Sequence, residues 1–91
     1  MIDVYDNYRI NKKKVGYDYI RQMIVMKLEN PFLTIRECIE RIANATKTSP
    51  VTVRKNIESV LKGSVLRFYS INDALKLIVE EENGIWVEEE V

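Results

Sequence analysis

The chain has 91 residues, of which 46% are hydrophobic and 31% are charged, with 14 Lys and Arg against 14 Asp and Glu. This length fits one compact domain and excludes two. The apolar content excludes a disordered chain, and no run approaches the roughly 18 apolar residues of a membrane span. We expect one domain, 1–91, whose hydrophobic core forms without a metal or a disulfide.

The composition also limits the chemistry. There is no histidine, the commonest metal ligand and the usual general base, and the three glycines are too isolated to cradle a phosphate. Cys38 is the only cysteine, which fits a reducing cytoplasm, and Met1 is not followed by a signal-like segment. We therefore expect a cytoplasmic binding protein without cofactor or metal. An enzyme would have to use carboxylates, lysine or tyrosine alone.

Charge is distributed unevenly along the chain. Residues 1–70 contain thirteen Lys and Arg against seven Asp and Glu, a net charge of +6. Residues 71–91 contain one lysine against seven acids, a net charge of −6. A basic body with an acidic end suggests a polyanionic partner, although two solvated surfaces that offset each other would give the same totals.

The first predicted helix spans residues 17–29 and follows an N-terminal arm at 1–16. Asp18 is the expected N-cap, and Asn30 before Pro31 is expected to end the helix. Its inward face at helical spacing consists of Ile20, Met23, Ile24 and Leu28. The arm alternates like a short strand at 2–5. Its basic residues fit a phosphate-binding arm and a solvated loop equally well; they are Arg9, Lys12, Lys13 and Lys14.

Two shorter helices are predicted within residues 34–63, after a possible small strand at Phe32-Leu33. Thr34 and Glu37 form a capping box at the start of the first, and Ser49-Pro50 caps the second, which ends at Gly63. The first stripe expected to be buried is Ile35, Cys38, Ile39, Ile42 and Ala43. The second is Val53, Ile57, Val60 and Leu61. Cys38 is therefore predicted to be a small core residue.

This segment resembles the helix-turn-helix core of winged-helix transcription regulators over about thirty positions, roughly a third of the chain. The resemblance is carried by Ile35, Ile39, Ile42-Ala43, Thr46, Ser49-Pro50-Val51-Thr52-Val53-Arg54-Lys55, Ile57, Leu61 and Gly63. It implies an α+β fold: a winged helix-turn-helix with a three-helix core and a C-terminal β-hairpin wing. The chain would then divide into the arm, a helical core at 17–63 with the helix-turn-helix at 34–63, and a wing region at 64–91.

The resemblance also implies that the helix at 50–62 reads the major groove of DNA. Stepping about 100° per residue from Val53 places Val51, Thr52, Lys55, Ser59 and Lys62 on the side opposite the buried stripe. Thr52 and Val51 could meet thymine methyl groups, and Arg54 or Lys55 could donate to guanine. Three residues are better placed for phosphate, namely Lys47, Thr48 and Ser49. An ordinary solvated helix face is the alternative.

The C-terminal region admits two folds after a predicted strand at 65–69. One is a helix from Asp73 to Glu82, with Gly84 as its stop and an inward stripe of Ala74, Leu75, Ile78 and Val79. The other is a hairpin of 76–82 and 85–90 joined by Asn83-Gly84, a strong turn signal. We favour the hairpin, because three glutamates at a helix C-terminus would oppose the helix dipole. Trp86 would be its packing anchor.

These patterns predict a sequence-specific double-stranded DNA-binding protein, a transcription regulator that acts as a homodimer. A second apolar strip on the first helix is the proposed dimer contact, formed by Tyr19, Met23 and Met26. The acidic wing would be repelled by phosphate, so it would face away from DNA or meet another protein. The alternative is a winged-helix module for protein–protein contact that uses this wing and the Tyr/Met strip, without specific DNA binding and without a membrane.

Overall fold

The structure, a computed structural model, describes residues 3–89. Five helices account for its regular elements, namely α1 (Val4–Asn7), α2 (Val15–Glu29), α3 (Ile35–Thr46), α4 (Pro50–Lys62) and α5 (Ile71–Glu81). No strand occurs among residues 3–89. The predicted α+β class and its β-hairpin wing are therefore wrong, and the described chain is all-helical.

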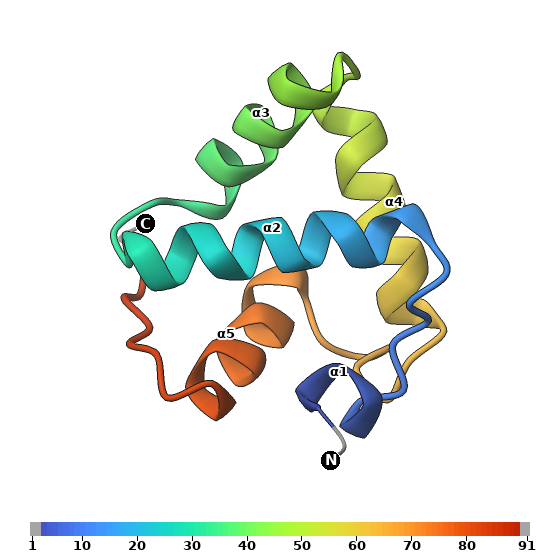
Figure 1. Cartoon of the computed structure of the whole chain (residues 1–91), viewed down its shortest axis with the longest axis vertical. Helices are drawn as coiled ribbons and strands as arrows, with labels where there is room; N and C mark the ends of the chain where they lie inside the picture. The colour runs from blue at the N-terminus through green and yellow to red at the C-terminus, as the bar shows by residue number, and fades with distance from the viewer. Residues whose placement is uncertain (1–2, 90–91) are drawn as a thin grey trace.

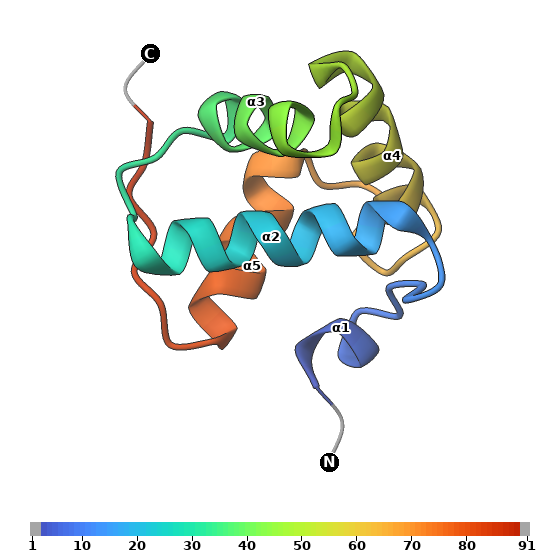
Figure 2. The same cartoon turned by 45° about the horizontal axis from the view of Figure 1, so that its top comes forward.

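Helix α2 runs across the middle of the molecule, with α3, α4 and α5 packed against it (Figure 1). The view in Figure 2 shows α3 and α4 on one side of α2 and α1 on the other. One continuous core fills the space between the helices, and the whole measures 32 × 26 × 24 Å. This arrangement leaves one long side of α4 outside the core.

Helix α2 starts two residues earlier than the sequence pattern predicts. Its N-cap is Lys14, without a side-chain cap, so the prediction of Asp18 is wrong, whereas the end at Asn30 is confirmed by an extended backbone before the proline. Leu28, expected in the core, is exposed, and Lys27 beside it is fully buried. A helix that packs on three others buries a wider face than one stripe.

Helices α3 and α4 begin where their caps predict and α4 ends as predicted at Gly63, whereas α3 continues to Thr46, beyond the last residue of its predicted stripe, Ala43. Thr34 accepts the Glu37 amide while the Glu37 carboxylate accepts the Thr34 amide, a complete capping box. Ser49 accepts the Thr52 amide ahead of Pro50, and Gly63 is the C-cap. Every residue of the two predicted stripes is buried. Local capping and helical periodicity were enough to define this segment.

The C-terminal region is helical where the hairpin was favoured. Asn83 has φ of 60° and follows the last turn of α5, while the Gly84 amide bonds back to the Val79 carbonyl at 2.9 Å. The tolerance of Asn for positive φ thus serves a Schellman C-cap instead of a hairpin turn. Burying each large side chain of the α5 stripe stabilises by about 1.5–3 kcal/mol, which exceeds the about 0.3–1 kcal/mol by which each terminal glutamate opposes the dipole.

The other predicted strands are also absent. Residues 64–69 form turns in which Leu66 is buried while Val65 and Phe68 point outward. Phe32-Leu33 lies in a turn, and the residues after Asp3 form the short helix α1, with the Asp3 carboxylate accepting the Asp6 amide. Apolar alternation predicts a strand only where a second strand can pair with it. Residues 2 and 90 of the predicted strands lie outside the described part of the chain.

None of the helices between residues 3 and 89 combines the length and the apolarity needed to cross a lipid bilayer.

Candidate nucleic-acid interface

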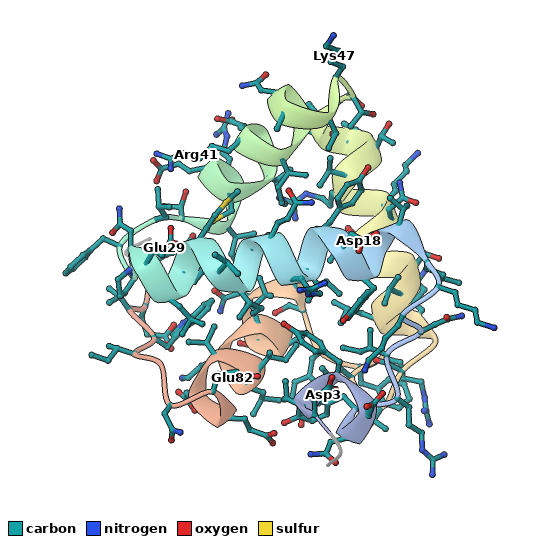
Figure 3. All side chains as sticks on the ribbon, viewed as in Figure 1. Asp3, Asp18, Glu29, Arg41, Lys47 and Glu82 are labelled. Atoms are coloured by element: carbon teal, nitrogen blue, oxygen red, sulfur yellow. The ribbon has the colours of Figure 1, made fainter. Side chains whose placement is uncertain are left out.

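The connection between α3 and α4 consists of residues 47–49. Lys47 adopts the left-handed backbone conformation, with φ of 55°, and the Thr48 amide bonds to the Ala43 carbonyl at 2.9 Å. Glycine or asparagine is the usual residue in this conformation. Figure 3 shows the Lys47 side chain projecting from the apex of the turn, away from the rest of the molecule. The apex of the turn therefore carries a lysine at a position where glycine or asparagine would adopt the backbone conformation with less strain.

The inner side of α4 is held close to α2. Val53 and Ile57 are fully buried, and Gly16 of α2 lies directly against the backbone of α4. A Cβ atom at Gly16 would overlap the Asn56 carbonyl oxygen and lie 2.5 Å from Val60 Cγ2. Only glycine permits this approach, which fixes the rotation of α4 and hence the side chains that it presents to solvent.

The outer side of α4 carries the residues that the sequence predicts to read bases. All are exposed: Val51, Thr52, Arg54, Lys55, Ser59 and Lys62. No other described segment of the chain covers them. Val51 is 62% exposed, so its methyl groups are accessible on this side. The face combines methyl groups, hydroxyl groups and cations, which are groups used to read base edges, and it also carries the exposed carboxylate of Glu58.

The residues predicted to contact phosphate are placed less uniformly. Lys47 is exposed, and Thr48 is half-buried. Ser49 is exposed, but its hydroxyl already accepts the Thr52 amide and donates to Thr52 Oγ1 at 2.9 Å. Ser49 therefore orients the first turn of α4, and of the three only Lys47 combines a free charge with full access to solvent.

Within residues 3–89, the cations of residues 45–67 form no ion pair with an acid. Ion pairs within residues 3–89 join Lys12 to Asp3 and Asp6, Arg36 to Glu40, and Lys76 to Glu88. The basic residues of 45–67 are in none of them; they are Lys47, Arg54, Lys55, Lys62 and Arg67. The one acid in this stretch is Glu58. The segment thus presents a net charge of +4 to solvent.

Two hollows flank the outer side of α4. One, of about 440 Å³, lies between α3 and α4 and is lined by Arg36, Glu40, Val51 and Lys55 among others. The other, of about 510 Å³, lies between α3, α4 and the start of α5. The basic residues lining this second hollow are Arg36, Arg54, Lys62 and Arg67. We call it the basic hollow; it extends the cationic face from α4 toward α5.

Sequence reasoning missed Arg36, Arg67 and Glu89 as neighbours of this face. Arg67 lay in a predicted strand, and Arg36 was noticed only as part of the capping-box segment. Glu89 reaches the hollow because the end of the chain folds back onto the start of α3, which no local pattern indicates. The net basic charge of residues 45–67 was the only sequence signal that indicated a cationic surface extending beyond α4.

The predicted dimer contact is not a free surface. Tyr19 and Met23 are buried in the core, and Met26 packs against it. The Tyr/Met strip is therefore part of the fold, and the prediction that it is unused by the core is wrong. The alternative of an interaction module loses its hairpin wing, and of the Tyr/Met strip only Tyr19 and Met26 line a surface groove.

The remaining candidate groups lie inside the protein. Cys38 is fully buried, and this burial raises the pKa of its thiol. No three His, Cys, Asp or Glu residues in the described part of the chain gather closely enough to hold a metal ion. Trp86 packs its ring against the Lys27 ammonium at 4.3 Å, as the anchor role predicts, although it does so in an extended segment.

Comparison of the chain with protein-family models, curated proteins and solved structures finds no match. The functional inference therefore depends on the geometry and charge of this face.

Proposed function

We propose that the protein binds double-stranded DNA sequence-specifically, with the outer side of α4 in the major groove, and that it acts as a transcription regulator. The observation that carries the proposal is the uncovered outer face of α4, which follows a three-residue turn and has α2 and α3 packed behind it. At about 1.5 Å per residue α4 is roughly 20 Å long. The major groove of B-DNA, about 12 Å wide, accepts such a helix.

The charge distribution supports the same orientation. The acids beside this face are Glu58, the paired Glu40 and Glu89, which accepts the Ile35 amide, whereas the five cations of 45–67 are free of ion pairs within the described chain. An isolated cation on a duplex neutralises a phosphate and releases its counterion, so free cations contribute more than paired ones. Thr52 and Val51 would then be near base edges, while Lys47 at the apex would lie near the backbone.

A homodimer on two half-sites belongs to the proposal but needs a surface other than the Tyr/Met strip. A shallow groove of about 650 Å³ on the outer side of α2 extends beyond that strip; Tyr19 and Met26 line part of it, and Val15, Arg21 and Val25 line the rest among others. Its apolar members Val15 and Val25 are 46% and 52% exposed. Sedimentation of the complex with a selected duplex gives the number of subunits bound, and footprinting gives the half-site spacing.

Binding of labelled duplex DNA as a function of salt tests the proposal. Selection from a pool of random duplexes supplies a ligand, and fluorescence anisotropy gives its affinity between low and moderate ionic strength. We expect log K to fall linearly with log salt, with a slope of about 0.9 for each phosphate contacted. Absence of duplex binding at any ionic strength, both by the wild type and by a variant without the Glu89 carboxylate, would contradict the proposal.

A further inference from the structure

The end of the described chain forms an extended strap, residues 84–89. It leaves α5 at the Schellman cap, passes the C-terminal end of α2, and reaches the start of α3 (Figure 2). Gly84 allows the departure, because a Cβ atom there would overlap the Leu28 side chain and lie 2.7 Å from Val79 Cγ1. The strap therefore follows a defined path over the core.

Two side chains anchor the middle of the strap. The Trp86 ring lies on the buried Lys27 ammonium, which itself donates to the carbonyls of Pro31 at 3.1 Å and Leu33 at 2.6 Å. Glu88 accepts from Lys76 at 2.7 Å, and this contact raises the pKa of the lysine. The anchors thus connect the strap to α2, to the turn before α3 and to α5.

The tip of the strap places a carboxylate at the N-terminus of α3. Glu89 Oε1 accepts the Ile35 amide at 2.8 Å and lines the basic hollow next to Arg36 and Arg54. A helix N-terminus with free amides and nearby cations is the environment that binds phosphate. Here an acidic side chain of the same chain holds that position.

We propose that the strap is an autoinhibitory element in which the Glu89 carboxylate occupies the place of a DNA backbone phosphate, so that duplex DNA and the strap bind in competition. The proposal rests on the proposed function. The hollow that Glu89 enters is continuous with the cationic side of α4 through Arg54 and Lys62. Duplex DNA on α4 would bring its phosphates toward the same hollow, where the strap carboxylates repel them.

The strap is held weakly enough to be displaced. Glu88 and Glu89 are exposed to solvent, where ion pairs are screened. The Trp86 Nε1 donor is buried with no acceptor among the described residues, which disfavours the closed position. DNA that replaces the carboxylates would release this unsatisfied donor into water.

Removal of the Glu89 carboxylate gives the main test. Glu89→Ala should bind the selected duplex about tenfold more tightly than the wild type. In the wild type, the apparent affinity is reduced in proportion to the fraction of molecules whose site is free of the strap, about one tenth. Glu80→Ala removes an equally exposed glutamate from α5 and is the matched control for net charge. Equal affinities of these two variants would overturn the proposal.

Lys76→Ala provides a second test, because the strap proposal predicts a gain in DNA affinity where the loss of a positive charge alone predicts a decrease. The loss of a cation should weaken binding to DNA, whereas the release of Glu88 should free the strap and strengthen binding about twofold. Circular dichroism shows whether the variant keeps its helices. Weaker binding by a folded Lys76→Ala variant would contradict the autoinhibitory role.

Trp86 is the only tryptophan and reports the strap directly. Its emission should shift toward that of a solvated indole as duplex is added to the full chain, with the same midpoint as anisotropy. Binding of duplex with unchanged Trp86 emission and no gain in Glu89→Ala would overturn the strap alone and leave the proposed function intact. Absence of duplex binding by both wild type and Glu89→Ala would overturn both, whereas binding only by Glu89→Ala would support strong autoinhibition.

Discussion

The α3–turn–α4 segment and the α5–strap segment treat their charges in opposite ways. In the second, acids are satisfied within the chain: Glu81 accepts the Tyr8 hydroxyl, Glu88 accepts from Lys76, and Glu89 accepts the Ile35 amide. In the first, the cations of residues 45–67 contact no acid. Figure 3 shows Lys47 at one end of the molecule and Glu82 toward the other. Other exposed cations of the described chain, Arg9, Lys13 and Arg41 among them, are also in no ion pair, so what distinguishes residues 45–67 is their excess of basic over acidic side chains.

The largest expected effect is on the free energy of unfolding and comes from the glycines at which each segment packs against α2. Gly16→Ala should destabilise the protein by about 3 kcal/mol, since the new methyl group would meet the backbone carbonyl of Asn56, which cannot move without shifting α4. Gly84→Ala should cost less, about 2 kcal/mol, because the Leu28 side chain can rotate away from the new methyl group, whereas the buried Val79, with Cγ1 at 2.7 Å, cannot. Urea unfolding measures both values.

Gly63→Ala is the control for these glycine substitutions, because its new Cβ would meet nothing closer than 3.8 Å. It should change the free energy of unfolding by no more than about 0.5 kcal/mol. A Gly16→Ala variant as stable as this control would show that α4 does not depend on close contact with α2.

The next effect is on DNA binding. Arg54→Ala and Lys55→Ala should each weaken the complex with the selected duplex by roughly 1–3 kcal/mol if the residue reads a base. A residue that contacts only phosphate should instead weaken all duplexes alike and reduce the salt slope by about one unit. Arg41→Ala, on α3 and outside the hollows beside α4 and α2, is the control for loss of one exposed cation. Affinities unchanged in both α4 variants would remove α4 from the interface.

Acid should affect the first segment through its capping box. Hydrogen bonds from Thr34 lower the pKa of Glu37 below its ordinary value of 4.5. A carboxylate whose pKa is lower in the folded state than in the unfolded state stabilises the protein at pH values above the unfolded-state pKa. This contribution is lost as the pH falls through the folded-state pKa. Stability should therefore decline more steeply below about pH 4.5 in the wild type than in Glu37→Gln, as measured by thermal unfolding. Parallel pH profiles would contradict this role of the carboxylate.

The smallest expected effect separates stability from binding at one residue. Lys47→Asn replaces a lysine in the left-handed conformation with a residue that tolerates it, so stability should stay constant or rise by up to about 1 kcal/mol. Duplex affinity should fall, because the charge at the apex is lost. A variant with unchanged affinity would place the turn outside the DNA contact.

The sequence predicted α3 and α4 well, because their signals are local. Thr34 with Glu37, and Ser49 with Pro50, define helix starts within a few residues, and the buried stripes follow from helical spacing. The exposure of the outer face of α4 follows from the same spacing. That it binds DNA is a prediction that no comparison with known proteins has tested.

The wing and the strap were not predictable for a different reason. Asn83-Gly84 fits a hairpin turn and a helix C-cap equally well, and only the core available to α5 decides between them. The Glu89–Ile35 contact joins residues 54 positions apart in the sequence, so no local pattern could reveal it. Lys27 was not expected to be buried because its partners are carbonyls of the next turn.

Cross-saturation from duplex protons to the backbone amides of deuterated protein tests most directly where the protein meets DNA. This NMR measurement reports proximity to the ligand and is insensitive to displacement of the strap elsewhere. We predict the greatest loss of signal at Thr52, Arg54 and Lys55, with little loss within α5. Saturation concentrated on α5 or on the outer groove of α2, with α4 unaffected, would contradict the assignment of α4 as the DNA-binding surface.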